Sequence, residues 1–432
     1  MSACRLCGAP LEHVVADLGV SPVSNDFLRE EDLGRMEPFY PLCALVCEVC
    51  LLVQLEAFEP PEKIFSDDYA YFSSFSTGWL DHARRYTDAI VERLGLGAES
   101  KVVEIASNDG YLLQYFVARG IPVLGVEPTA NTAAVAIAKG VPTEVRFFGS
   151  ETAADLHRAG HAADLLIANN VLAHVPDLND FVAGLAMLLA PEGVLTIEFP
   201  HLLRLLEEAQ FDTIYHEHYS YFSLLTASRA LERHGLAIFD VEEVPTHGGS
   251  LRIYAGHAPG ALIWQNEWSR PEPPVVSDLG ATPRGEPGER VRELQERERA
   301  AGLEELPTYL AFAERVRREK REIVRFFIEQ KEAGVSIAGY GAPAKGNTLL
   351  NYCGIGRDFI DYTVDLNPHK QGRYLPGTHI PIRDPDEIRR TQPALVFILP
   401  WNLREEVIEQ LAFVREWGGR FAARSPSIRI FP

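Results

Sequence analysis

A cluster of titratable side chains lies between Tyr215 and Tyr219, where His216, Glu217 and His218 follow one another. The segment has no helical or strand period that would carry all three into solvent. Histidine is well suited to proton transfer near neutral pH, and an adjacent carboxylate can raise its basicity or fix its tautomer. For an isolated histidine, loop capping would be the preferred interpretation, but three titratable neighbours favour catalysis. The spacing alone does not separate His216 from His218.

Two C-x-x-C pairs near the amino terminus predict a metal site. Cys4 and Cys7 form the first pair and Cys47 and Cys50 the second. Each tight turn directs two thiolates at one ion, and four thiolates leave no open position, so we expect a structural zinc ion (Zn2+). Four plain thiols or a redox pair are the alternatives, and Cys43 is close enough in sequence to be a spare ligand.

The stretch 101–128 reads as strand, turn, helix and strand. Glu104, Asn108, Asp109 and Gly110 stand at the end of the first strand, and Glu127 ends the second, where an acid can bind both ribose hydroxyls of an adenosine. No G-x-G-x-x-G is present, and the carboxylates would repel a pyrophosphate but attract a cationic ligand with an amino acid end. S-adenosylmethionine fits that description. The alternative is an ordinary capped turn.

The α/β pattern continues to the hairpin expected after His234. Helices are expected over 79–94, 111–119, 131–139 and 178–190, with strands over 164–168 and 194–199 and a turn at Pro191-Glu-Gly193 between the last helix and strand. The carboxyl ends of these strands share one face. The cofactor-binding residues predicted there are Glu104, Ala106, Asn108, Asp109, Gly110, Glu127, Pro128, Asn169 and Asn170.

A second α/β unit starts near Val335, after a proline- and glycine-rich linker over 269–289 and one or two charged helices over 290–332. Its turn, Gly339 to Gly346, has the spacing G-x-G-x-x-x-x-G, and Asp365 ends the next strand. This is weak evidence for NAD. Nucleotide binding, with Lys345 near a phosphate, and a ligand-free packing domain are both compatible with it.

Length and charge limit the function classes. With 432 residues, of which 46% are apolar, the chain is long enough for two or three domains. The predicted divisions are 1–75 for zinc, 76–262 for the cofactor, 263–332 for the linker and bridging helices, and 333–432 for the carboxyl-terminal domain. A net charge of −20 disfavours nucleic acid and anionic membranes as partners. Lacking an apolar leader or an eighteen-residue apolar window, the protein is expected in the cytoplasm, as a monomer by default.

The order of these motifs resembles the sugar C-methyltransferase family of deoxysugar biosynthesis, to which the tetronitrose C-3' methyltransferase belongs. The resemblance covers essentially the full length. It rests on the two cysteine pairs and on Glu104-x-x-x-Asn108-Asp109-Gly110, Asn169-x-Val171-x-x-His174-Val175-x-Asp177, Tyr215-His-Glu-His218, Gly339-Tyr-Gly-Ala-Pro-Ala-Lys-Gly346 and Gly372-Arg-Tyr-Leu-Pro-Gly377.

The resemblance implies a zinc-binding amino-terminal domain, a central seven-stranded class I S-adenosylmethionine methyltransferase domain and a carboxyl-terminal Rossmann-like α/β domain. The implied substrate is a nucleotide-linked 4-keto-deoxysugar, usually on dTDP, methylated at C-3 or less commonly at C-5. His218 would be the base that forms an enolate, Tyr215, Glu217 and His174 would orient the sugar or stabilise the enolate, and Tyr69 would close the pocket. The residues assigned to the nucleotide-sugar are Tyr340, Lys345, Asn347, Asp365, Lys370 and Arg373.

Two readings of other classes remain at this point. The glycine turn at Gly339 would suit a nicotinamide-dependent oxidoreductase, which predicts tight NAD binding by the carboxyl-terminal half. A noncatalytic zinc-bearing binding module is the other, although it would leave the His-Glu-His cluster without a purpose.

Overall fold

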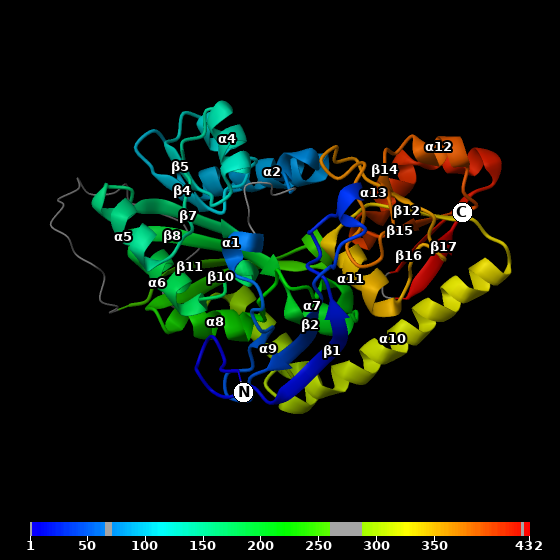
Figure 1. The fold of residues 1–432 in the computed structure, drawn as a ribbon. Coiled ribbons are helices and arrows are strands. Elements are labelled where there is room, and N and C mark those ends of the chain that lie inside the picture. Colours follow the sequence, from blue (N-terminus) through cyan, green and yellow to red (C-terminus); the bar gives the residue numbers. More distant parts are fainter. Residues whose placement is uncertain (1, 65–70, 260–286, 425–426) are drawn as a thin grey trace.

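In the part of the chain that the structure describes, three β-sheets of four, seven and six strands organise the protein (Figure 1). Their arrangement comes from a computed structural model, which describes residues 2–64, 71–259, 287–424 and 427–432. Tyr69 and most of the predicted linker over 269–289 lie outside the described residues.

The central sheet has the strand order β10-β11-β8-β7-β4-β5-β6. The strands from β8 to β6 pair in parallel, whereas β11 runs antiparallel between β8 and β10. This confirms the predicted seven-stranded α/β sheet and its closing hairpin. The strands are β4 (Val102–Ile105), β5 (Val123–Val126), β6 (Thr143–Glu144), β7 (Ala163–Asn169), β8 (Leu189–Pro200), β10 (Leu236–Val244) and β11 (Ser250–His257).

Helices cover both faces of this sheet, because successive residues of its buried strands point to opposite sides. Val102 and Ile167 pack in the core with α2 and α3, whereas Val103 and Leu166 pack with α5, α6 and α8. Ser76 caps α2 by accepting a hydrogen bond from the Trp79 amide. The helices are α2 (Thr77–Leu94), α3 (Leu113–Val117), α4 (Ala130–Ala138), α5 (Ser150–Arg158), α6 (Leu178–Leu188), α7 (Leu202–Glu207) and α8 (Leu224–Glu232).

The turn predicted at Pro191-Glu-Gly193 is wrong. These residues belong to β8, and the register against β7 shifts between the pairs Ala163–Leu189 and Leu165–Val194. They therefore form an irregular stretch within the strand, where proline cannot donate to the ladder and glycine permits close backbone approach. A Cβ on Gly193 would lie 2.5 Å from the Ala163 carbonyl oxygen.

The amino-terminal sheet takes its fourth strand from far along the chain. Its order is β1-β2-β3-β9, all antiparallel. Because β9 begins two residues after His218, the candidate catalytic segment is hydrogen-bonded into this sheet. The elements are β1 (His13–Ser21), β2 (Tyr40–Val46), β3 (Val53–Gln54) and β9 (Ser220–Tyr221), with the short helix α1 (Pro61–Ile64) following β3.

The carboxyl-terminal domain is a second α/β unit, as predicted, with the strand order β14-β13-β12-β15-β16-β17. All neighbouring strands pair in parallel except β16 and β17. Its strands are β12 (Ile337–Tyr340), β13 (Thr363–Val364), β14 (Ile382–Arg383), β15 (Leu395–Ile398), β16 (Arg420–Arg424) and β17 (Ile428–Phe431), and its helices are α11 (Ala344–Cys353), α12 (Glu387–Thr391) and α13 (Arg404–Gln410).

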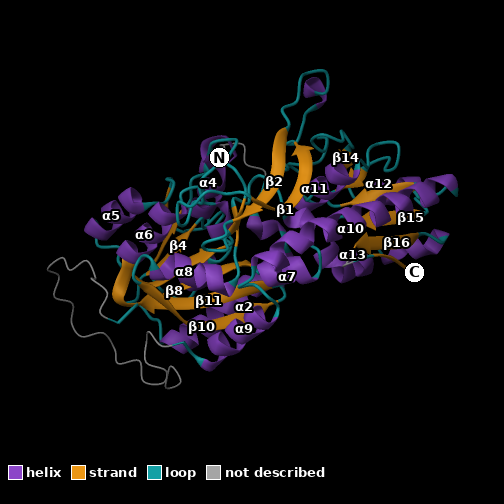
Figure 2. Cartoon of the chain, turned by 90° about the horizontal axis from the view of Figure 1, so that it is seen from below, coloured by secondary structure: helices purple, strands orange, loops and turns teal. Residues whose placement is uncertain are grey.

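Two helices bridge the domains, α9 (Glu289–Ala300) and α10 (Leu306–Glu332). The long helix α10 buries a stripe that includes Phe312, Val316 and Ile323. Figure 2 shows it beside β1 and α11, so one core joins the amino-terminal sheet to the carboxyl-terminal domain. Among the helices in the described ranges, none is long and apolar enough to cross a membrane.

Candidate active site

The loop after β4 has left-handed backbone conformations of the kind usually found at glycines, although it contains few of them. Ala106, Asn108 and Gly110 have φ values of 57°, 49° and 73°. Alternating left-handed residues bend the backbone tightly at the carboxyl end of the strand, where a ligand can approach it. Asparagine and glycine tolerate this conformation, whereas alanine pays about 1–2 kcal/mol for it.

Replacing Ala106 by glycine is therefore expected to keep or raise the free energy of unfolding, by up to about 1 kcal/mol. Relief of the left-handed strain stabilises the folded state, whereas the larger conformational entropy of glycine stabilises the unfolded chain, so the two effects partly cancel. Ala134→Gly, at an exposed position within α4, is the matched control and should cost about 1 kcal/mol. Urea denaturation of both variants tests this, and equal destabilisation would contradict it.

Six of the nine predicted cofactor residues line one large cavity. They are Ala106, Asn108, Glu127, Pro128, Asn169 and Asn170. The other three lie behind the loop: Glu104 is buried in β4, where burial raises its pKa well above the usual value, and Gly110 packs against α4. Asp109 pairs with Lys139, 3.3 Å between Oδ2 and Nζ, so its charge is balanced outside the cavity.

Glu127 ties the loop to the next strand. Its Oε2 accepts a hydrogen bond from the Asn108 amide at 2.9 Å and its Oε1 accepts one from the Thr129 amide at 3.0 Å. Burial raises the pKa of this carboxyl group. A carboxylate has about four lone-pair sites, so Glu127 can hold the loop and still accept from ribose hydroxyls.

The cavity has a volume of about 1070 Å³. Its walls come from every part of the fold: Asn25 from the amino-terminal region, Asn108 and His218 from the central part, and Lys345 and Asn402 from the carboxyl-terminal domain. Pockets for one small molecule ordinarily measure about 300–1,000 Å³. The space therefore suits a cofactor and a second ligand together.

His218 and Tyr215 form a hydrogen-bonded pair in the cavity wall. The Tyr215 hydroxyl lies 2.8 Å from His218 Nε2, and His218 Nδ1 lies 3.1 Å from the Thr213 carbonyl oxygen. Because a carbonyl only accepts, Nδ1 carries the hydrogen and Nε2 keeps a lone pair. Burial, with the neighbouring His174, lowers the pKa of His218 well below its usual value. The ring is thus neutral near pH 7 and its Nε2 can accept a proton.

His174 has the same tautomer. Its Nδ1 donates to the Glu217 carbonyl at 2.7 Å, and its ring centroid lies 4.7 Å from that of His218. Burial lowers the pKa of His174 to about 4. Both rings therefore present Nε2 as an acceptor, and neither donates from that nitrogen while it is neutral.

The structure separates His216 from His218, which spacing could not do. His216 Nε2 donates to the Pro41 carbonyl at 3.1 Å, and its ring lies outside the cavity beside Tyr40. Glu217 lines the cavity and is held from behind, since its Oε1 accepts from the amide and the side chain of Asn25, both at 3.0 Å. Burial raises its pKa.

The neutral histidines predict a loss of stability in acid. A buried histidine with a lowered pKa stabilises the fold fully above its unfolded pKa of about 6.5, and that contribution is lost as the pH falls below this value. For His174 the loss should run from about pH 6.5 to about pH 4, at roughly 1 kcal/mol per pH unit, and His218 should add a loss of the same sign below about pH 6.5. Urea denaturation from pH 7.5 to 5 should show a shallower slope in His174→Gln than in the wild type; equal slopes would contradict this.

Two of the six residues assigned to the nucleotide-sugar, Lys345 and Lys370, line the cavity. Lys345 Nζ donates to Asn402 Oδ1 at 2.9 Å and lies 4.6 Å from the Trp401 ring centroid. Burial lowers the pKa of Lys345 to about 8. It stands at the second position of α11, so the helix amino terminus adds positive potential there.

The other four do not line the cavity: Tyr340, Asn347, Asp365 and Arg373. Asp365 accepts hydrogen bonds from the amides of Ala342 and Asn367, each at 2.8 Å, so it fixes the glycine turn of its own domain. Tyr340 donates to Gln410 at 2.6 Å, and Asn347 is fully buried in α11. Their assignment to the substrate stays a prediction without support from this geometry.

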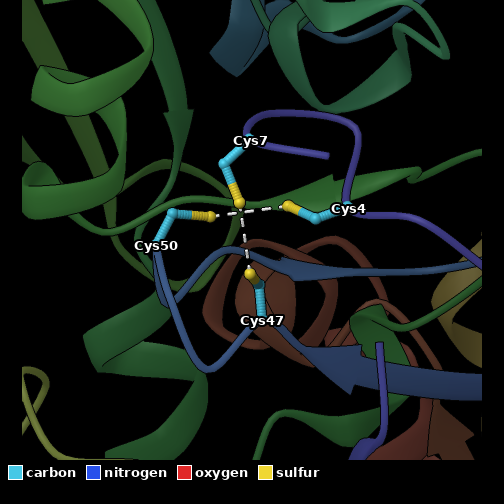
Figure 3. Close-up of side chains that lie close together, drawn as sticks. All are labelled: Cys4, Cys7, Cys47 and Cys50. Carbon is cyan, nitrogen blue, oxygen red and sulfur yellow. Dashed lines mark hydrogen bonds between the residues drawn. The ribbon is translucent and has the colours of Figure 1, made fainter. Parts of the chain in front are cut away.

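Four cysteine sulfurs converge between the amino-terminal loop and the turn after β2 (Figure 3). All four lie within 4.8 Å of one another, and the pairs Cys4–Cys50 and Cys7–Cys47 are each 3.4 Å apart. Tetrahedral zinc with bonds of about 2.3 Å places its sulfurs roughly 3.8 Å apart, so the cluster fits the ion. Cys43 is not in this cluster.

Models of three protein families match successive parts of the chain. Residues 4–65 match "Putative zinc binding domain", residues 79–241 match "Methyltransferase domain", and residues 275–426 match "C-methyltransferase C-terminal domain". The C-methyltransferase NovU of Streptomyces niveus is 36% identical over 430 residues, which cover 99% of this chain and 96% of that protein. The chain belongs to the C-methyltransferase family.

Two further similarities cover smaller parts of the chain. Ubiquinone biosynthesis O-methyltransferase of Rhodopseudomonas palustris (strain BisA53) is 25% identical over 117 residues, 27% of this chain and 46% of that protein. The crystal structure of magnesium protoporphyrin IX methyltransferase from Synechocystis PCC 6803 with bound S-adenosylmethionine is 15% identical, with a TM-score of 0.34, and covers 47% of this chain and 100% of that one.

The C-methyltransferase depends on S-adenosylmethionine, and its cysteine cluster suits a structural metal ion. Four thiolates close the metal site, and Gln54 Nε2 donates to Cys4 Sγ at 3.2 Å, a contact that supports a thiolate ligand. The sequence alone left two alternatives, a nicotinamide-dependent oxidoreductase and a noncatalytic binding module. Membership of the C-methyltransferase family replaces both.

A polar network that the sequence does not predict lies between α2 and the closing hairpin, in and behind the wall of the C-methyltransferase's cavity. Glu198 lies 2.9 Å from His82 and 2.8 Å from Arg252, and accepts from Thr246 at 2.8 Å. Burial alone would raise the pKa of Glu198, but His82 and Arg252 lower it to about 2. The position of Glu198 just before the strand end at Pro200 was the one available signal, because its partners come from distant segments.

Proposed function

We propose that the enzyme methylates a nucleotide-linked 4-keto-deoxysugar, carried on dTDP, at C-3. The observation that carries this proposal is the single cavity that joins the loop after β4, the Tyr215–His218 pair and Lys345. A cofactor site, a base and a cation beside a helix amino terminus are what a C-methylation on a diphosphate-bearing ketone requires. The relationship to NovU, a C-methyltransferase, agrees with it.

His218 is the base in this proposal. A hydrogen on the carbon next to a ketone is acidic, and Nε2 takes it as a proton, the C–H electron pair becoming the C=C bond of an enolate. Tyr215 donates to the same nitrogen at 2.8 Å, so its hydroxyl must turn aside for the sugar. When bound, S-adenosylmethionine would supply an electrophilic methyl group to the enolate carbon, and the S–CH3 electron pair would stay on sulfur.

Lys345 and Lys370 bind the diphosphate of the substrate. Both residues line the cavity from the carboxyl-terminal domain, and Lys370 Nζ also donates to the Ala342 carbonyl at 2.9 Å. The protein is acidic overall, so these two local cations would attract an anionic ligand. Glu217, fixed by Asn25, then faces the sugar and orients it. The expectation of a monomer stays a prediction.

The test is mass spectrometry with labelled S-adenosylmethionine and a dTDP-4-keto-deoxysugar generated in place. The expected result is a gain of one methyl group on the sugar, with loss of the exchangeable hydrogen at C-3 as seen by NMR. Methylation at C-5, the other carbon that flanks the ketone, would overturn the regiochemistry alone. Binding of the cofactor without any methyl gain would move the acceptor to another chemical class.

A further inference from the structure

His247 lies in the wall of the cavity and has no part in the assignments above. It stands in the turn between β10 and β11, with its ring centroid 5.1 Å from that of Trp79. Within the described ranges, no hydrogen bond to the protein joins either ring nitrogen. A polar ring is thus held at the site with its hydrogen-bonding capacity unused by the protein.

The backbone of His247 is strained. Its φ of 55° and ψ of 15° are left-handed, a conformation that costs a residue other than glycine about 1–2 kcal/mol. The turn is clamped on both sides of it, since Thr246 donates to Glu198 at 2.8 Å and Gln210 Nε2 donates to the Gly248 carbonyl at 2.8 Å. Strain of this kind persists where the surroundings impose it, and it concentrates at functional sites.

The turn also reaches the carboxyl-terminal domain. Gly248 has a φ of 96°, and a Cβ there would lie 2.3 Å from Trp401 Cη2, so the backbone sits directly on that ring. The Trp401 ring in turn lies below Lys345. His247 is therefore fixed relative to both walls of the cavity.

The proposed reaction needs a donor that the assigned histidines cannot supply. An enolate oxygen is stabilised by an N–H or O–H aimed at it. His174 and His218 both spend their Nδ1 hydrogens on carbonyl groups, at 2.7 and 3.1 Å, and present Nε2 as an acceptor. Tyr215 directs its hydroxyl at His218 in the unliganded site, and after turning aside for the sugar it can give the oxygen one hydrogen bond. A second donor aimed at the same oxygen would stabilise the developing charge further.

We infer that His247 is that donor, a further catalytic residue that hydrogen-bonds the sugar oxygen as it becomes the enolate oxygen. The inference rests on the proposed function. As His218 takes the proton from carbon, the π pair of the carbonyl moves onto oxygen, and the His247 N–H stabilises the charge there. Burial, with Lys345 nearby, lowers the pKa of His247 to about 4, so the ring is neutral and keeps one N–H.

Two substitutions test this without disturbing the backbone. His247→Gly removes the imidazole and suits a left-handed residue, so the variant should melt no lower than the wild type. His247→Asn tolerates the same conformation and keeps an N–H donor. Both are compared with the wild type for methyl transfer and, with S-adenosylhomocysteine in place of the methyl donor, for exchange of the sugar's hydrogen with deuterated solvent.

The expected result is a fall of about 100- to 1,000-fold in both rates for His247→Gly, with the KM for S-adenosylmethionine unchanged and a partial recovery in His247→Asn. Full exchange in His247→Gly, or a change confined to KM or to the melting temperature, would overturn the inference while the proposed function stands. A wild-type protein that neither exchanges nor methylates a dTDP-4-keto-deoxysugar would overturn both.

Discussion

Replacing His218 by asparagine is expected to abolish methyl transfer while leaving S-adenosylmethionine binding intact. The amide can still donate to the Thr213 carbonyl, as Nδ1 does at 3.1 Å, but it has no basic lone pair in place of Nε2. Loss of a positioned base costs about 100- to 10,000-fold in rate. The cofactor loop, 106–110, is a separate part of the cavity wall. Turnover with labelled cofactor and isothermal titration with S-adenosylmethionine measure the two effects.

His216→Asn is the matched control, since His216 donates to Pro41 and lies outside the cavity. It should retain activity within a few-fold even if it lowers the melting temperature. Wild-type turnover in His218→Asn would rule out the base. The low pKa of His218 also predicts that the acid limb of kcat/KM lies below the value of about 6.5 expected for an ordinary histidine.

Much of the cofactor site is predictable because its geometry is local. Once 102–105 and 123–126 are recognised as parallel strands, their carboxyl ends must meet, and Asn108 and Glu127 meet with them. The cysteine cluster is predictable for the same reason, since each C-x-x-C turn fixes its own two sulfurs. In both cases the short-range pattern already contains the contact.

Local sequence patterns do not predict contacts between segments that are far apart in the chain. Nothing in the sequence around Ser220 and Tyr221 indicates that they pair with Val53 and Gln54 of the amino-terminal sheet. The same holds for Arg252, which reaches Glu198 and His82 only after the hairpin has closed the sheet. Backbone conformations such as that of His247 are equally invisible, because tertiary contacts impose the strain.

The carboxyl-terminal assignments rest on a local analogy that this geometry does not support. The end of the second strand binds ribose in dinucleotide folds, and here Asp365 accepts hydrogen bonds from two backbone amides of the turn, so its role toward the substrate stays a prediction. The cavity instead meets this domain along the start of α11 and around Asn402, which brings Lys345 into the wall. The domain thus resembles a nucleotide-binding unit, but the part of it that lines the cavity is the start of α11 and the region around Asn402, and not the end of its second strand.

Loss of the metal ion is expected to disable catalysis as well as the amino-terminal fold. The turn that holds Cys47 and Cys50 leads directly into β3, and β3 pairs with β9, whose first residue follows Tyr219. The Leu55 amide donates to the Tyr219 carbonyl at 3.0 Å, one residue from His218. Structural zinc contributes about 10–16 kcal/mol in zinc-finger peptides, against total stabilities of about 5–15 kcal/mol for whole domains. Without the ion, the support of the catalytic segment should therefore fail.

Cys47→Ser tests this coupling, with Cys43→Ser as its control, because Cys43 lies in β2 outside the cluster. We expect the purified wild type to hold one zinc ion by atomic absorption, Cys43→Ser to keep it, and Cys47→Ser to lose it together with methyl transfer. S-adenosylmethionine binding should outlast turnover in Cys47→Ser, because the loop after β4 has its own sheet. Full activity in a metal-free Cys47→Ser protein would show that β3 holds His218 in place without the ion, and that the metal site serves the amino-terminal fold alone.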